Sequence, residues 1–120
     1  MGVVKAKVRL RKVSRPRRFD VILVDLDPTL GSEIRKTRPC VVVSPDEINA
    51  FIDTVVVAPM TTGTHAYPTR IPCTFRRRTG YVVIDQLRTI DTTRVVRLLG
   101  AIDAETQKTV LRALASFFAP

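Results

Sequence analysis

The stretch of residues 20–44, DVILVDLDPTLGSEIRKTRPCVVVS, holds two short aliphatic runs on either side of a long polar segment. The runs, Asp20–Leu26 and Pro39–Ser44, are rich in valine, isoleucine and leucine, which is typical of buried β-strands. The segment between them, Asp27–Thr37, contains proline, glycine and serine, which interrupt regular structure. A loop of this length is unusual in a compact β domain, so we expect it to serve a function.

The aliphatic pattern returns further along the chain. Thr54–Pro59 (TVVVAP) and Gly80–Asp85 (GYVVID) are expected to be strands, and another extended segment is expected near residues 69–75. The strands do not alternate regularly with helices. This order predicts a small open β-barrel rather than a parallel sheet.

Two helices are expected. Residues 44–51 (SPDEINAF) predict a short helical turn with Pro45 at its first helical position. Residues 104–118 predict a longer helix capped by Asp103. Apolar side chains recur in it at three- and four-residue steps, at Val110, Leu111, Leu114, Phe117 and Phe118. The fold class is therefore mainly β with a C-terminal helix.

Charge is distributed unevenly. The chain has 120 residues, 45% of them hydrophobic, enough for one modest core, and a formal charge of +9. The first 18 residues carry eight of the 20 basic residues and none of the 11 acidic ones. We therefore expect a flexible basic leader over residues 1–17 and one nearly neutral domain over residues 18–120. The leader either touches phosphates non-specifically or is only solvated, and the sequence leaves both open.

No apolar run reaches the roughly 18 residues that span a bilayer, and the N-terminus lacks the apolar core of a signal peptide. The two cysteines, Cys40 and Cys73, form no Cys-x-x-Cys pair and no metal framework, so we expect both to be small buried residues. We expect a cytoplasmic protein with no membrane partner, no metal and no cofactor.

Arg38 lies where the polar loop meets the second aliphatic run. Pro39 disfavours helical geometry at Arg38, and proline is tolerated at the first residue of a strand. The guanidinium would then extend from a stiff backbone beside a mobile loop, and its planar fork of donors suits a phosphate. The alternative is an ion pair with a nearby acid such as Glu33.

Other polar side chains follow predicted strands. Thr61 and Thr62 follow VVVAPM, and Gln86 follows YVVID. Each also has a simpler explanation, because threonine often forms turns and glutamine often faces water. His65 is the only histidine and lies in a predicted loop, where we expect it to be exposed. RNA chemistry without a histidine pair would depend on charge stabilisation by arginine, threonine and backbone donors.

Three ordered blocks carry a resemblance to a known family: LVDLDPTLGSEIRKTRPCVVVSP, VVVAPMTT and YVVIDQLRTID, followed by the terminal helix. From about residue 18 to the end, the chain resembles the MazF/PemK toxin endoribonucleases of bacterial toxin–antitoxin modules. The resemblance implies an SH3-like β-barrel of the MazF/CcdB type and a homodimer. It also implies metal-independent cleavage of single-stranded RNA, and silencing by a MazE-like antitoxin whose disordered tail covers the RNA site.

The resemblance also assigns residues. Arg38 and Thr61 match the catalytic arginine and threonine of the family, and Glu33 matches an acid implicated in RNA contact or catalysis. The expected RNA-binding positions are Ser32, Lys36, Thr62, Gln86 and Arg88. The chain departs from the family at Phe19, where a glycine is usual, which puts the opening turn in question.

The expected reaction is attack of a ribose 2′-hydroxyl on the adjacent phosphate, with Arg38 stabilising the developing charge. Thr61 would donate to the same oxygens, and Glu33 is the best candidate for the base. Two alternatives have a different function: a CcdB-like toxin that poisons DNA gyrase by binding, and a non-catalytic RNA-binding module.

Overall fold

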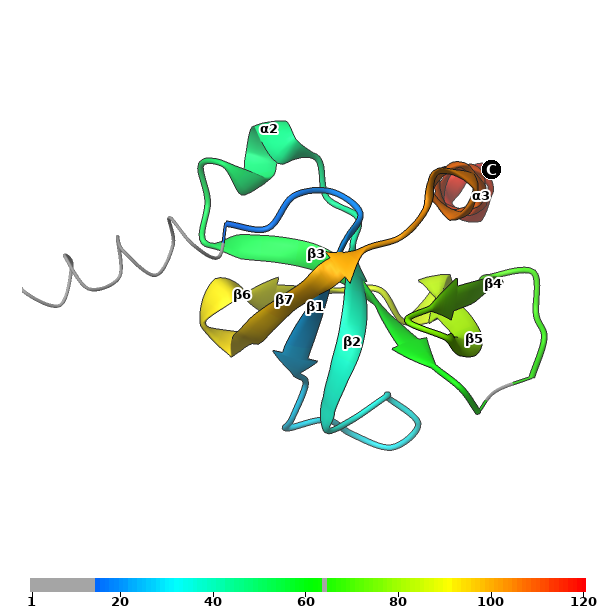
Figure 1. Ribbon diagram of the computed structural model, residues 1–120, viewed down its shortest axis with the longest axis horizontal. Helices are drawn as coiled ribbons and strands as arrows, with labels where there is room; N and C mark the ends of the chain where they lie inside the picture. Colours follow the sequence, from blue (N-terminus) through cyan, green and yellow to red (C-terminus); the bar gives the residue numbers. More distant parts are fainter. Residues whose placement is uncertain (1–14, 64) are drawn as a thin grey trace, which may run out of the picture.

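The computed structural model describes residues 15–63 and 65–120 (Figure 1). The strands are β1 (Asp20–Asp25), β2 (Thr37–Val42), β3 (Thr54–Thr61), β4 (Arg70–Phe75), β5 (Arg78–Val83), β6 (Arg88–Asp91) and β7 (Val95–Ala101). The helices are α2 (Asp46–Asn49) and α3 (Ala104–Phe118), and the 3₁₀ turns are η1 (Ile84–Gln86) and η2 (Thr92–Arg94). The predicted mainly β fold with a C-terminal helix is confirmed.

All strand pairings are antiparallel, and the strands form one seven-stranded sheet in the order β4-β5-β3-β2-β1-β7, with β6 paired to β3. β3 is the central strand: Cys40 of β2 faces Pro59, Val55–Val57 pair with β6, and Met60 and Thr61 pair with β5. Because η1 interrupts the chain between β5 and β6, these two strands follow one another along β3. The sheet therefore curls into an open barrel.

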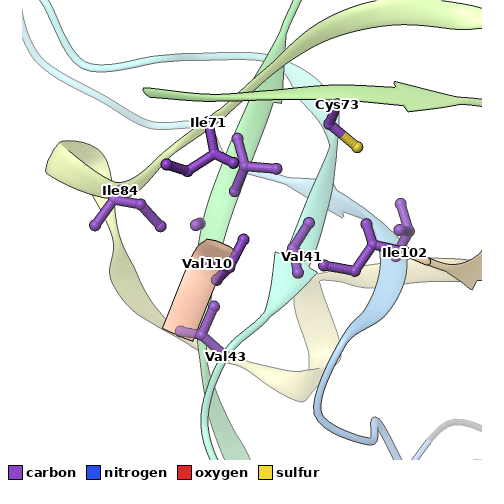
Figure 2. Close-up of a cluster of buried hydrophobic side chains, with 10 residues drawn as sticks. Val41, Val43, Ile71, Cys73, Ile84, Ile102 and Val110 are labelled. Atoms are coloured by element: carbon purple, nitrogen blue, oxygen red, sulfur yellow. The ribbon is translucent and has the colours of Figure 1, made fainter. Parts of the chain in front are cut away.

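Two buried clusters hold the curled sheet together. Figure 2 shows the first, in which Val110 of α3 packs among side chains that include Val41 of β2, Ile71 of β4 and Ile84 of η1. The second contains Ile22, Val24, Leu26, Cys40, Val42, Val55, Val57 and Ile90. Burial of apolar surface stabilises both clusters by about 25 cal/mol per Å² removed from water. The free cysteines are both buried, as predicted.

Most predicted elements are present, with local differences. α3 has the predicted bounds, and the Asp103 side chain accepts a hydrogen bond from the Thr106 N–H (2.8 Å). β2 begins at Thr37, so the prediction that Pro39 is the first residue of the strand is wrong. Pairing with β3 starts only at Cys40, so the missing N–H of Pro39 removes no bond from that ladder.

The other differences lie at the ends of elements. The strand predicted over residues 80–85 instead ends at Val83, where η1 takes over. Pro45 is the residue before α2 rather than its first helical residue. Boundaries of this kind depend on tertiary pairing, which local sequence does not record.

Phe19 keeps the opening turn although the family usually has glycine there. Its φ is +75°, a left-handed conformation that is costly for a bulky side chain. In compensation, its N–H donates to the Val42 carbonyl (2.7 Å) and its ring packs against the first cluster. The Ile102 N–H donates to the Phe19 carbonyl (3.1 Å), so this turn also fixes the segment that leads into α3.

The end of the predicted leader contacts the domain. Arg15 donates to the carbonyl of Ile52 (2.6 Å) and pairs with Asp53 (3.4 Å), and Pro16 is buried. Residues 1–14, on which the predicted role of the leader rests, lie outside the described residues. Within residues 15–63 and 65–120, none of the helices has the length and apolar character needed to cross a membrane.

Candidate active site

Arg38 and Thr61 come together at the end of the β2–β3 pair. The register places Cys40 opposite Pro59, and extending it by two residues places Arg38 opposite Thr61. Opposite residues of an antiparallel pair lie on the same face of the sheet. Both line one pocket of about 130 Å³ between β2, β3, β4 and β5, which we call the Arg38 pocket. Its polar lining comprises Arg38, Thr61, Thr62, Arg78, Thr79 and Tyr81.

The Arg38 guanidinium has no carboxylate partner in the described part of the chain. Its Nε donates to the Arg35 carbonyl (3.1 Å), which fixes the plane of the fork. The alternative of an ion pair with Glu33 is not formed; the Glu33 carboxylate instead accepts a hydrogen bond from the Leu30 N–H (2.6 Å) in its own loop. The two terminal amino groups of Arg38 make no hydrogen bond with the described residues, so they can bind an anion in the pocket.

The Thr61 hydroxyl is held by a local turn. Its oxygen accepts a hydrogen bond from the Gly63 N–H (3.3 Å), the pattern of a turn closed by a threonine side chain. A hydroxyl that accepts one bond still has its own proton to donate. Thr61 can therefore donate to an oxygen bound beside Arg38.

A second, larger cavity of about 680 Å³ lies beneath the loop between β1 and β2. Its lining includes Leu30, Glu33, Asp85, Gln86 and Arg88, and we call it the Gln86 cavity. Pro59 lines this cavity and the next residue, Met60, lines the Arg38 pocket, so both hollows border β3. The structure therefore separates Glu33 from Arg38 and Thr61 and places it in the Gln86 cavity.

Gln86 holds the long loop in place. Its Oε1 accepts a hydrogen bond from the Ile34 N–H (2.7 Å), and its Nε2 donates to the Ser32 carbonyl (3.3 Å). Arg88 donates from Nη1 to the Leu26 carbonyl (3.2 Å) at the start of the same loop. Both side chains were predicted from sequence to bind RNA, and both already support the loop that covers the Gln86 cavity.

The remaining predicted RNA-binding residues are exposed. Ser32 and Lys36 lie on the loop, and Thr62 lies at the end of β3 in the Arg38 pocket. The Lys36 N–H donates to the Asp27 carboxylate (3.1 Å), and the residue has φ of +71°. The Lys36 ammonium makes no hydrogen bond or ion pair with the described residues. His65 is exposed, as predicted.

Arg78 is a candidate that the sequence did not single out. Phe75 pairs with Arg78 across a two-residue hairpin loop, Arg76–Arg77, in which both φ angles are positive (49° and 66°). Arg76 donates to the Leu99 carbonyl and lies over the Phe75 ring, so it faces away from the pocket. Arg78 lines the pocket and adds a second guanidinium to it. The signal available in the sequence is the run of three arginines, Arg76–Arg78, just before Gly80.

Asp85 and Cys40, near the two hollows, have shifted pKa values. Hydrogen bonds from the Arg70 guanidinium to both Asp85 oxygens (3.2 and 3.1 Å) hold the pKa of that carboxyl below its usual value. Burial raises the pKa of the Cys40 thiol to about 12, so this thiol is not a nucleophile. Among the described residues there is no group of three or more His, Cys, Asp or Glu side chains that could hold a metal ion.

The comparisons with known proteins identify the family. A family model described as PemK-like, MazF-like toxin of type II toxin-antitoxin system matches residues 17–118. The chain belongs to this toxin family. The resemblance inferred from the three sequence blocks is thereby confirmed.

Relatives are similar over much of their length. The chain is 38% identical to endoribonuclease PemK of Escherichia coli over 87 residues, 68% of this chain and 65% of PemK. It is 37% identical to the endoribonuclease toxin MazF of E. coli K12 over 75 residues, 62% of this chain and 68% of MazF. It is 33% identical to endoribonuclease EndoA of Bacillus subtilis over 104 residues, 82% of this chain and 90% of EndoA.

Solved structures share the fold. The chain matches MazF from Deinococcus radiodurans with a TM-score of 0.76 at 24% identity, over 85% of this chain and 94% of that one. A mycobacterial endoribonuclease in complex with its cognate antitoxin matches with a TM-score of 0.72 at 26% identity, over 84% of this chain and 92% of that one. The MazF-type barrel is confirmed, and the names of the relatives favour an endoribonuclease over the gyrase-binding alternative.

Proposed function

We propose that this chain is an endoribonuclease toxin that cleaves single-stranded RNA in the Arg38 pocket. The observation that carries the proposal is that Arg38 and Thr61, from different strands, line one small pocket in a chain of the PemK/MazF toxin family. The Arg38 amino groups have no carboxylate partner among the described residues. The pocket therefore offers charge and hydrogen-bond donors to a phosphate.

In the proposed reaction the substrate supplies the nucleophile. The ribose 2′-oxygen forms a bond to the adjacent phosphorus as the bond from phosphorus to the 5′-oxygen breaks, and the products are a 2′,3′-cyclic phosphate and a 5′-hydroxyl. The 2′-hydroxyl proton passes to a base, and the leaving 5′-oxygen takes up a proton. Arg38 stabilises the negative charge that builds on the phosphate oxygens, and Thr61 donates to the same oxygens. Arg78 adds a second positive charge.

Glu33 remains the proposed base, and its position sets a requirement. The carboxylate lies in the Gln86 cavity and is bound to the Leu30 N–H, so it reaches the Arg38 pocket only if its loop moves when RNA binds. If Glu33 is the base, Glu33→Gln removes the acidic limb of the pH profile of cleavage. If it only contacts RNA, the variant raises KM and keeps the profile.

RNA bases are proposed to enter the Gln86 cavity while the scissile phosphate lies in the Arg38 pocket. Single-stranded RNA is read by hydrogen bonds and stacking to unstacked bases, which needs a recess beside the phosphate site. Ser32, Lys36 and Thr62 present exposed polar groups along this path, and Gln86 and Arg88 shape its wall.

The proposed partners are inferred from those of related proteins. A mycobacterial endoribonuclease of the same fold forms a complex with its cognate antitoxin, and we extend this to a MazE-like antitoxin for this chain. We also propose a homodimer acting in the cytoplasm, because pairing of identical surfaces would lengthen the RNA groove of a small barrel. Sedimentation that shows an active monomer at micromolar concentration would overturn the dimer.

The direct test is cleavage of long RNAs in EDTA by three variants. Arg38→Ala and Thr61→Ala should each lose about 10²–10³-fold in rate, the usual cost of one donor to a developing oxyanion. Arg112→Ala is the control, because it removes the same charge from α3, away from both hollows. Near-normal cleavage by the Arg38→Ala variant would contradict the proposal.

A further inference from the structure

Gly80 lies in β5 directly against the backbone of Thr61. A β-carbon built on Gly80 would be 2.5 Å from the Thr61 carbonyl oxygen, 3.1 Å from its carbonyl carbon and 3.3 Å from the Thr62 Cα. All three are backbone atoms of β3, so no side chain can rotate away to relieve the contact. The absence of a β-carbon at Gly80 is what lets β3 approach β5 this closely.

The close approach falls where β3 ends. Met60 and Thr61 pair with Val82 and Tyr81, and extending this register by one pair places Thr62 opposite Gly80. The strand stops at Thr61, and the chain bends over Gly80 as it leaves the sheet. This bend brings the Gly63 N–H back to the Thr61 hydroxyl oxygen (3.3 Å).

We propose that Gly80 is a positioning residue for RNA cleavage, which sets the Thr61 hydroxyl in the Arg38 pocket by admitting the bend of β3. The inference rests on the proposed function of Thr61. Gly80 itself touches no substrate. It acts through the path of the Thr61–Gly63 backbone, and this path decides which way the hydroxyl points.

A methyl group at Gly80 would displace this backbone. To reach even the shortest tolerated separation of 3.0 Å, the Thr61 carbonyl must move by about 0.5 Å. A misplacement of about 1 Å at a reacting group can cost about 10²-fold in rate, because only closely aligned reactants react efficiently. Gly80→Ala is therefore expected to lower kcat by about 10- to 100-fold while KM changes less than threefold.

Ala101→Val is the control. It adds apolar bulk to an exposed strand residue of β7 that lines neither hollow, so the Thr61–Gly63 segment is untouched. We expect its kcat to stay within about twofold of the unaltered chain. Thermal unfolding of each variant defines a common assay temperature at which all are folded.

A double-mutant cycle separates positioning from general damage. If Gly80 acts through Thr61, Gly80→Ala costs 10- to 100-fold in the unaltered chain but almost nothing in a Thr61→Ala background. Equal losses in both backgrounds, or unchanged kcat, would overturn the inference. A Gly80→Ala protein that does not fold would overturn it too, since Gly80 would then serve the barrel as a whole.

A measurement without RNA keeps the inference separate from the proposed function. In Gly80→Ala, the amide resonances of Thr61–Gly63 should shift and the Gly63 amide should exchange with solvent at least fivefold faster. If the unaltered chain cleaves no RNA, the proposed function fails while this measurement still decides whether Gly80 sets the bend. Unchanged resonances and exchange would refute the positioning role even in an active enzyme.

Discussion

Replacing Gln86 with leucine should loosen the loop between β1 and β2 without unfolding the barrel. The change removes two hydrogen bonds, from the Ile34 N–H (2.7 Å) and to the Ser32 carbonyl (3.3 Å). At a net value of about 1 kcal/mol each, the loop loses about 1–2 kcal/mol, which lowers the ratio of ordered to open loop about 5- to 30-fold. Hydrogen exchange of the Leu26 and Glu33 amides reports this directly, because the substitution leaves their own bonds in place.

A graded series tests the reasoning. Gln86→Glu keeps the acceptor for Ile34 and loses only the donor to Ser32, so its exchange should lie between that of the unaltered chain and Gln86→Leu. Gln107→Leu is the control, because it removes one glutamine hydrogen bond (3.0 Å to the Ile102 carbonyl) on α3. If Gln86→Leu weakens RNA binding while loop exchange stays unchanged, Gln86 contacts RNA directly and the loop account is wrong.

Three further predictions concern charge. Arg78→Ala should lower kcat/KM at least tenfold, because a charged hydrogen bond to phosphate is worth about 1.5–3 kcal/mol. The control, Arg77→Asn, keeps a residue suited to the left-handed turn and should change kcat/KM less than threefold. Equal losses in the two variants would show that Arg78 has no specific role in the pocket. Asp85→Asn should destabilise the fold at pH 7. Hydrogen bonds from Arg70 lower the pKa of folded Asp85, so its contribution is present above the unfolded pKa of about 4 and is lost as the pH falls through the lowered folded value. Urea titrations of the two proteins should therefore converge in acid, and a constant gap would contradict the ion pair. Deleting residues 1–14 should flatten the salt dependence of RNA binding and leave the cut sites unchanged, whereas a new cut sequence would mean that this segment reads bases.

Much of the site was readable because its parts are local in sequence. Arg38 and Thr61 each lie at the end of an aliphatic run, and antiparallel pairing of β2 with β3 brings these ends together. Composition predicted strands close to β1–β5 but did not delimit β6 and β7, and the Asp103 cap with its apolar helix predicted α3 at its observed bounds. In each case a short stretch of sequence carries the physical cause.

The features that could not be predicted from the sequence depend on contacts between segments that are far apart in the chain. The link from Gln86 to the loop spans 52 residues and cannot be inferred from either end. Arg78 escaped notice because its hairpin turn places arginines at two left-handed positions where glycine or asparagine would be the usual signal. The start of β2 was predicted two residues too late, at Pro39, because the sequence does not show that Thr37 and Arg38 already pair with β1 before the strand meets β3.

The most direct test of the account uses an RNA whose cut site has been mapped, with the single ribose before the cut replaced by deoxyribose. The proposed mechanism needs the 2′-hydroxyl as nucleophile, so this strand should bind with nearly unchanged affinity and remain uncut. The unsubstituted RNA, incubated in EDTA, should yield a 2′,3′-cyclic phosphate and a 5′-hydroxyl. Cleavage of the deoxy strand at the same bond, or products with a 5′-phosphate, would contradict the account.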